Sequence, residues 1–205
     1  NVNGANLRFL LRKAAEGSYV ADTEFIETLA GFGLRELVLP FESRNTEIMA
    51  KYASGKYDPD AMDSAALVRA LKRAGIRISG NFMIGFRDEP WESVLRTKEF
   101  ARQLLAEGLD ALGFMIPVPY PGSLDFETLM RDSALRAEFD RDPLRFTDHM
   151  HWRARPLFPT VVPGDRLEAA THEFWLELND ESYTARKLTQ NVAASSSTAA
   201  GGLGG

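Results

Sequence analysis

The chain has 205 residues, a formal net charge of -5 and no cysteine. Without cysteine it forms no disulfide and offers no thiolate as a nucleophile or as a ligand for zinc or an iron–sulfur cluster. The chain is acidic overall and contains no block of lysine or arginine, so we predict no nucleic-acid partner. No apolar run is long enough to cross a membrane and Asn1 opens no recognisable signal peptide, so we expect a cytoplasmic protein.

The amino-terminal part of the chain predicts short elements. Residues 1–4 contain an Asn-Gly pair and are typical of a turn that ends a strand, with no apolar run before it. The mixed apolar and basic pattern of residues 7–15 predicts a short helix. Asp22 is placed to cap a second helix, which extends to residue 30 and ends at Gly31 or Gly33.

Three later stretches share one order: helix end, glycine, apolar strand, then a polar or proline-rich loop. The expected strands cover residues 34–41, 76–86 and 111–118, and the expected helices cover residues 46–52, 58–74 and 90–105. Strands joined through helices are parallel, and continuous apolar runs are typical of strands that helices cover on both faces. Three strands are too few to close a barrel. We therefore predict an α/β fold, a partial parallel (β/α) barrel of about three βα units.

The pattern changes near residue 130. Residues 124–139 predict a helix, residues 140–163 are irregular and rich in proline and aromatic side chains, and residues 166–188 predict an amphipathic helix. The last residues, 191–205, are of low complexity and have little to bury. We expect a barrel part at 1–130, a helical and irregular extension at 131–190, and a disordered tail at 191–205.

Parallel sheets bind ligands at the carboxyl ends of their strands, which brings residues 85–89 and 117–123 together at a predicted site. Glu42 leaves the first strand there, either as an acid–base or ligand-binding group or as a helix-capping or salt-bridged surface carboxylate. Glu89, just before Pro90, suits the first turn of a helix as well as a site.

Other candidate residues also have two interpretations. Asn81 and Met83 face either a cofactor or the neighbouring helices, and Gly85 either admits a ligand to the backbone or makes a tight turn. His149 and His151 are spaced to share one face of a strand. They have no obvious further ligand apart from distant His172, so we interpret them as surface or packing residues and predict no metal site.

Three ordered stretches carry a resemblance to a known family. They are LVLPFESRNTEIMAKYASGKYD, LKRAGIRISGNFMIGFRDEPWESV and LGFMIPVPYPGS. Together they resemble the second half of the radical S-adenosylmethionine (radical SAM) core, in particular the branch that often carries an N-terminal cobalamin-binding domain. The resemblance covers residues 1–129 and identifies the three predicted strands with the fourth, fifth and sixth of six βα units.

In that family the first half of the barrel supplies a CxxxCxxC loop that holds a 4Fe-4S cluster. S-adenosylmethionine binds this cluster and is reductively cleaved to a 5′-deoxyadenosyl radical. Because this chain has no cysteine to hold the cluster, it is either part of a longer enzyme or a descendant that has lost catalysis. The start on a turn without a preceding strand favours the first, with the missing N-terminal half of the barrel as the partner. The resemblance also implies cobalamin as a further cofactor, and it leaves the substrate, a small molecule or a peptide, unidentified.

The resemblance also implies cofactor contacts. The first strand end would lie near the ribose or methionine part of S-adenosylmethionine, the second strand and its loop would pack on the adenine, and the third would offer backbone contacts to it. The implied residues are Glu42, Ser43, Asn81, Met83, Gly85, Glu89, Ile116, Pro117 and Pro119. Two motifs depart from the family: GFRDEP stands where GlPgET is common, and PYPGS replaces PYPGT.

Two other functions remain open. The lack of cysteine favours a non-catalytic binding or scaffold protein derived from the same core. An ordinary parallel-barrel enzyme would use Glu42 and Glu89 as acid and base. The sequence shows no glycine-rich phosphate loop and no third catalytic group to accompany them.

Overall fold

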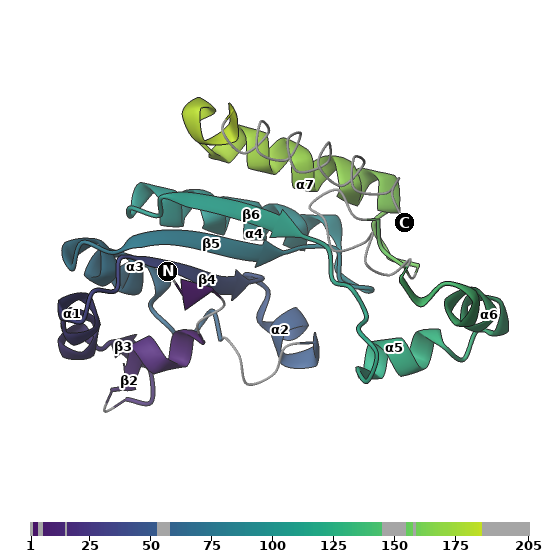
Figure 1. The fold of residues 1–205 in the computed structure, drawn as a ribbon, viewed down its shortest axis with the longest axis horizontal. Coiled ribbons are helices and arrows are strands. Elements are labelled where there is room, and N and C mark those ends of the chain that lie inside the picture. Colours follow the sequence, from purple (N-terminus) through teal and green to yellow (C-terminus); the bar gives the residue numbers. More distant parts are fainter. Residues whose placement is uncertain are drawn as a thin grey trace, which may run out of the picture.

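A four-stranded parallel sheet organises the protein, with strand order β1-β4-β5-β6 (Figure 1). The computed structural model describes residues 2–3, 6–14, 16–52, 58–144, 155–157 and 159–185. The sheet strands are β1 (Val2–Asn3), β4 (Glu36–Glu42), β5 (Arg77–Met83) and β6 (Ala111–Met115). The predicted α/β class is confirmed, and within the described residues the sheet does not close into a barrel.

Helices connect and flank these strands. They are η1 (Leu7–Leu10), α1 (Thr23–Gly31), α2 (Thr46–Tyr52), α3 (Ser64–Arg73), α4 (Trp91–Ala106), α5 (Leu124–Leu129), α6 (Ser133–Arg141) and α7 (Gly164–Leu178). The predicted order of helix, glycine and strand is confirmed at Gly33, Gly75 and Gly108, each of which has a positive φ. Each glycine therefore ends one helix just before β4, β5 or β6 begins.

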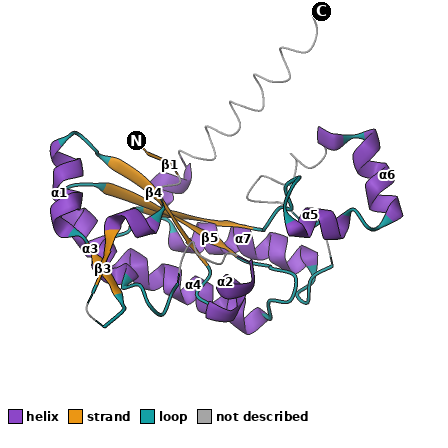
Figure 2. Ribbon diagram, turned by 90° about the horizontal axis from the view of Figure 1, so that it is seen from below, coloured by secondary structure: helices purple, strands orange, loops and turns teal. Residues whose placement is uncertain are grey.

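The two faces of the sheet differ. Helices α3, α4 and α7 lie on the same side of it (Figure 2). The covered face is fully buried and apolar, with Leu37, Leu39, Phe41, Ile78, Phe82 and Phe114. The opposite face carries half-exposed residues, including Val38, Pro40, Ser79, Asn81, Met83 and Met115. The expectation that helices cover both faces is therefore wrong for the described residues. Ser79 and Asn81 alternate with buried neighbours, which is the pattern of a one-sided sheet.

Aromatic side chains form the centre of the covered face. The Phe82 ring lies 5.6 Å from Phe41, 5.5 Å from Phe114 and 6.0 Å from Phe100 of α4. The Phe174 ring of α7 lies 5.3 Å from Phe114. Residues beyond 130 thus share the core of the sheet, and the predicted division of the chain at that position stays a prediction.

Of the predicted helices in the first half of the chain, one is wrong and another begins later than expected. The helix predicted at 7–15 is wrong, because residues 7–13 form η1 followed by strand β2 (Leu11–Lys13), which pairs antiparallel with β3 (Tyr19–Ala21). Ala14 donates to Ser18 across the turn between them. The helix expected from residue 58 begins at Ser64, because Asp63 caps it while the Asp58 carboxylate accepts from two amides of its own turn.

The carboxyl-terminal helices are shorter than expected. The helix expected at 124–139 is divided into α5 and α6, because the Asp132 carboxylate accepts from the amides of Ala134 and Leu135 and starts a new helix. Helix α7 ends at Leu178, and Asn179 follows in extended conformation. His149, His151 and the tail at 191–205 lie outside the described residues.

Two absences concern the described part of the chain alone. There, no helix is both long and apolar enough to cross a lipid bilayer. Over the same residues, no three histidine, aspartate or glutamate side chains are grouped so that they could hold a metal ion.

We expect Phe82→Ala to lower the free energy of unfolding by about 3 to 5 kcal/mol, because it leaves a cavity among the three aromatic rings of Phe41, Phe100 and Phe114. Phe32→Ala is the matched control, since Phe32 is 88% exposed, and its effect should stay within about 0.5 kcal/mol. Urea denaturation followed by far-UV circular dichroism measures both. Equal effects of the two substitutions would contradict this description of the core.

Candidate functional site

The carboxyl ends of β4 and β5 meet against the first turns of α4, where buried polar side chains connect them. Glu89 lies in the loop after β5 and is 0% exposed. Its Oε2 accepts from the Gly85 amide at 2.8 Å and the Phe86 amide at 3.3 Å, and its Oε1 accepts from Ser93 Oγ at 2.7 Å. The carboxylate therefore closes its own loop and joins it to α4.

The surroundings of Glu89 shift the pKa of its carboxyl group. Burial raises the pKa of the Glu89 carboxyl above its ordinary value, and the hydrogen bonds from Ser93, Gly85, Phe86 and Ser43 oppose that rise. The first of these effects is the larger. Glu89 is not the cap of α4, because Pro90 occupies the N-cap position without a side-chain hydrogen bond.

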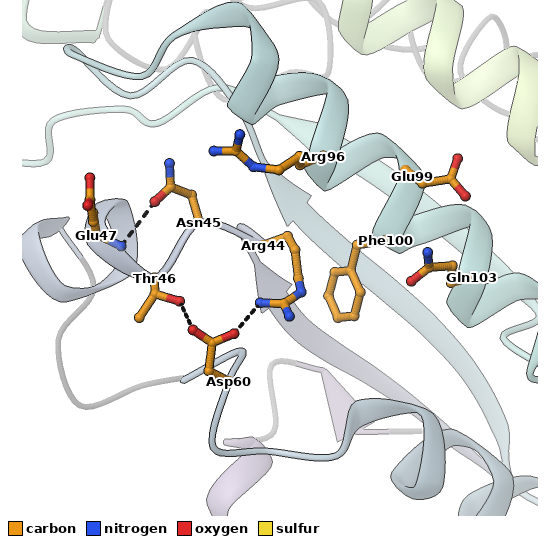
Figure 3. Close-up of a pocket in the computed structure, with 9 residues that line it drawn as sticks. All are labelled: Arg44, Asn45, Thr46, Glu47, Asp60, Arg96, Glu99, Phe100 and Gln103. Carbon is orange, nitrogen blue, oxygen red and sulfur yellow. Dashed lines mark hydrogen bonds and ion pairs between the residues drawn. The ribbon is translucent and has the colours of Figure 1, made fainter.

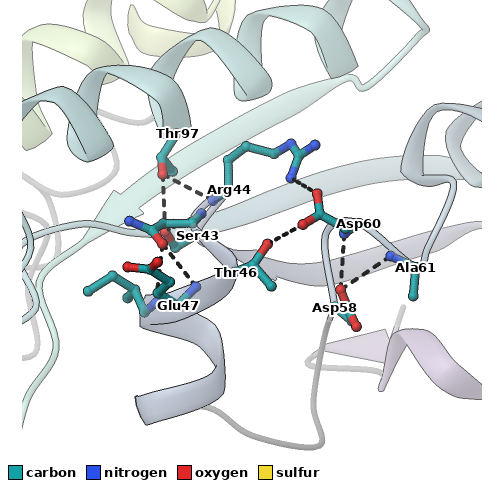
Figure 4. A network of polar contacts seen from close by, with 10 residues as sticks. Ser43, Arg44, Thr46, Glu47, Asp58, Asp60, Ala61 and Thr97 are labelled. Atoms are coloured by element: carbon teal, nitrogen blue, oxygen red, sulfur yellow. Dashed lines mark hydrogen bonds and ion pairs between the residues drawn. The ribbon is translucent and has the colours of Figure 1, made fainter.

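The loop after β4 joins the same network (Figure 4). Ser43 Oγ lies 3.2 Å from Thr97 Oγ1 and 3.5 Å from Glu89 Oε1, the second distance being at the limit of a hydrogen bond. Thr97 Oγ1 also accepts from the Arg44 amide at 3.1 Å, and Ser43 Oγ accepts from the Asn45 amide at 3.1 Å. Both strand-end loops are thus held by one helix.

Glu42 occupies an unusual backbone position. It has φ 55°, the only positive φ of a non-glycine residue among the described ones, and the β4–β5 register shifts between Pro40 and Glu42. The side chain is nearly enclosed, with the residue 5% exposed. A left-handed glutamate at a bulge is energetically unfavourable, and such positions occur frequently at functional sites.

Gly85 is explained by packing. It has φ 84°, and a Cβ atom there would lie 2.7 Å from Leu167 Cδ1 of α7. Its amide already donates to Glu89. The structure therefore favours the interpretation of Gly85 as part of a tight turn over that of a ligand contact. Leu167 of α7 occupies the space beside its Cα atom.

The uncovered face of the sheet continues to the carboxyl ends of β5 and β6. Asn81 pairs with Gly113 and Met83 with Met115 across β5 and β6. The nearest atom to a Cβ built on Gly113 would be Asn81 Oδ1 at 3.9 Å, so there is open space above this glycine. Asn81, Met83 and Pro117 are half-exposed, whereas Ser43, Gly85, Glu89, Ile116 and Pro119 are buried. The predicted site residues therefore divide into a surface group and a supporting group.

Several residues of this region were not predicted. Ser93 and Thr97 are both 0% exposed and lie four residues apart on α4. Their signal in the sequence is a pair of hydroxyl side chains at helical spacing within the apolar stripe of that helix. A pocket of about 620 Å³ between the β4–α2 loop and α4, lined in part by Arg44 and Arg96, was also missed (Figure 3).

Comparison with known proteins gives one distant relative. No protein-family model matches the chain. The chain is 27% identical over 160 residues to a protein of Pyrococcus horikoshii named an uncharacterized methyltransferase. The match covers 78% of this chain and 30% of that protein, so the chain spans less than a third of its relative's length.

We expect Glu89→Ala to destabilise the fold by about 3 kcal/mol, because the Gly85 amide and Ser93 hydroxyl lose their buried acceptor. Glu89→Gln keeps one acceptor oxygen for the backbone amides and should cost about 1 kcal/mol. Urea denaturation at neutral pH compares the two variants. An equal loss in both would mean that shape, not hydrogen bonding, is what Glu89 contributes.

A second prediction concerns pH. Because the native pKa of Glu89 is raised, the folded state binds more protons than the unfolded state between the ordinary and the raised values. Stability due to this group is therefore present at low pH and lost as pH rises through the native pKa. The stability difference between the wild type and Glu89→Gln should fall over that window in denaturation experiments from pH 4 to 8. Parallel curves for the two proteins would disprove it.

Proposed function

We propose that this chain forms the S-adenosylmethionine-binding half of a radical methyltransferase barrel, and that the other half of the barrel is its partner. Three findings support the proposal. The first is the order of the strand-end motifs, and the second is a parallel sheet with one uncovered face that extends to the carboxyl ends of its strands. The third is similarity to a protein named a methyltransferase. The observation that carries most weight is the open surface at Asn81 and Gly113.

The residues of this surface suit a nucleoside. Gly113 leaves room for a flat ring, and the side chains of Met83 and Met115 provide a half-exposed apolar surface beside it. The Asn81 amide offers a donor and an acceptor to a base edge. Bound S-adenosylmethionine would supply the methyl group to be transferred, and these residues would bind and orient its adenosyl part.

The supporting residues act from behind this surface. Glu89, Ser93 and Thr97 fix the two strand-end loops through buried hydrogen bonds. Such fixed loops keep the strand ends in one geometry, which lowers the entropy that is lost when a ligand binds. In this proposal Glu89 and Ser43 position the site without touching the ligand.

A 4Fe-4S cluster does not fit the residues of this chain, which has no cysteine to ligate it. The proposal therefore assigns the cluster thiolates to the partner half, and it assigns no residue of this chain to cobalamin. The same observation favours a second candidate, a non-catalytic binding protein derived from this core. A CxxxCxxC motif in the coding sequence upstream of Asn1 would support the enzyme, and its absence there would support the binding protein.

We expect Gly113→Val to weaken S-adenosylmethionine binding at least about tenfold, because the new side chain fills the open space beside Asn81. Valine suits a strand, so the fold should be retained. Asn81→Ala should weaken binding about fivefold through the lost hydrogen bonds.

Arg77→Ala serves as the control at the far end of β5, where the residue is exposed. Equilibrium dialysis of labelled S-adenosylmethionine with the natural gene product that contains this sequence measures all three variants. Unchanged affinity in both Gly113→Val and Asn81→Ala would refute the assignment of the adenosyl site.

A further inference from the structure

A pocket lies on the other side of the sheet from the uncovered face. It has a volume of about 620 Å³ and is formed by the β4–α2 loop, the turn at Asp60 and the exposed side of α4 (Figure 3). Phe100 belongs to its lining, and the same ring packs edge-on against Phe41 and Phe82 of the covered face. The pocket is therefore separated from the Asn81 surface by the sheet itself.

Two of the three acidic residues of the pocket, Asp60 and Glu99, are paired with arginines of the protein. Asp60 accepts from Arg44 Nη1 at 2.7 Å and from Thr46 Oγ1 at 2.5 Å, as Figures 3 and 4 show. These two contacts lower the pKa of the Asp60 carboxyl, Thr46 having the larger effect and Arg44 the next, so it stays ionised. Glu99 is paired with Arg102 on the outer side of α4. Glu47 is the remaining carboxylate of the lining.

Two arginines line the pocket from different elements. Arg44 comes from the β4–α2 loop, where its guanidinium carbon lies 5.9 Å from the centre of the Phe100 ring and one of its nitrogens is bound to Asp60. Its other nitrogens are outside that ion pair. Arg96 comes from α4, is exposed, and forms no ion pair or hydrogen bond within the described part of the chain. Its head group is directed toward the loop that carries Asn45 (Figure 3).

The remaining lining is fixed and partly apolar. Asn45 Nδ2 donates to Ser93 Oγ at 3.0 Å, and Asn45 Oδ1 accepts from the backbone N–H of Glu47 at 3.0 Å. These two bonds fix the orientation of the Asn45 side chain. Phe100 contributes an apolar ring to the lining, and Gln103 lies beside it. A volume of about 620 Å³ lies within the range of small-molecule sites.

We propose that this pocket binds a small molecule through a phosphate or carboxylate group held between Arg44 and Arg96, with the rest of the molecule against Phe100. Guanidinium groups match the oxygens of either anion, and two of them from separate elements select a group with several oxygens. The site is distinct from the proposed S-adenosylmethionine surface, so the two proposals succeed or fail independently.

Isothermal titration with inorganic pyrophosphate and with succinate, at constant ionic strength, tests the proposal. We expect saturable binding of at least one probe, and the tighter probe identifies the class of anion. Arg96→Gln should weaken it at least about tenfold, because one charge-assisted hydrogen bond is lost. This substitution removes no internal contact of the described residues, so the fold should be kept.

Arg73→Gln is the matched control, since Arg73 is exposed at the end of α3 and lies outside the pocket. It removes the same charge and should leave binding unchanged. Absence of saturable binding for both probes would overturn the proposal. So would an equal loss in Arg73→Gln and Arg96→Gln, which would show a non-specific response to net charge.

Discussion

The buried carboxylate of Glu89 is the constraint that the rest of the site depends on. A carboxyl group with no exposed surface needs several hydrogen bonds, and here the donors come from its own loop and from α4. Satisfying this one group therefore determines where α4 begins relative to the end of β5. Ser43 and Thr97 extend the same requirement to β4, so two loops far apart in sequence share one anchor.

Helix α7 imposes a second constraint on the same loop. Leu167 occupies the space beside Gly85, and Asn179 at the end of the helix binds both the amide and the carbonyl of Leu112 in β6. The helix is thus held at two points along the sheet. Its aromatic residue Phe174 joins the Phe82 cluster through Phe114. The conformation of the loop after β5 is consequently fixed by two contacts: the Glu89 carboxylate binds its amides, and Leu167 of α7 packs against Gly85.

Local signals in the sequence were sufficient where the cause is local. Asp22 caps α1 as predicted, and glycines precede β4, β5 and β6, because these features depend on a few neighbouring residues. The β2–β3 pairing and the division between α5 and α6 were missed, since the same residues also suit helices. The Ser43–Glu89 contact joins residues 46 positions apart, and no pattern within either strand specifies it. The pocket at Arg44 and Arg96 likewise exists only once the fold brings α4 to the loop.

The one-sided sheet has a physical consequence for function. Apolar burial on the covered face determines the position of β5, and each residue buried there directs its neighbours, such as Asn81 and Met83, to the opposite face. The polar network of Glu89 lies at the strand ends, where that burial stops. Core packing and site geometry are therefore separable: the aromatic rings stabilise the sheet, and the buried hydroxyl and carboxyl groups set the loops. Ser93 and Thr97 of α4 lie between the aromatic core and the two strand-end loops. A substitution at either position can therefore move both strand ends without changing a residue of the aromatic core or of the uncovered face.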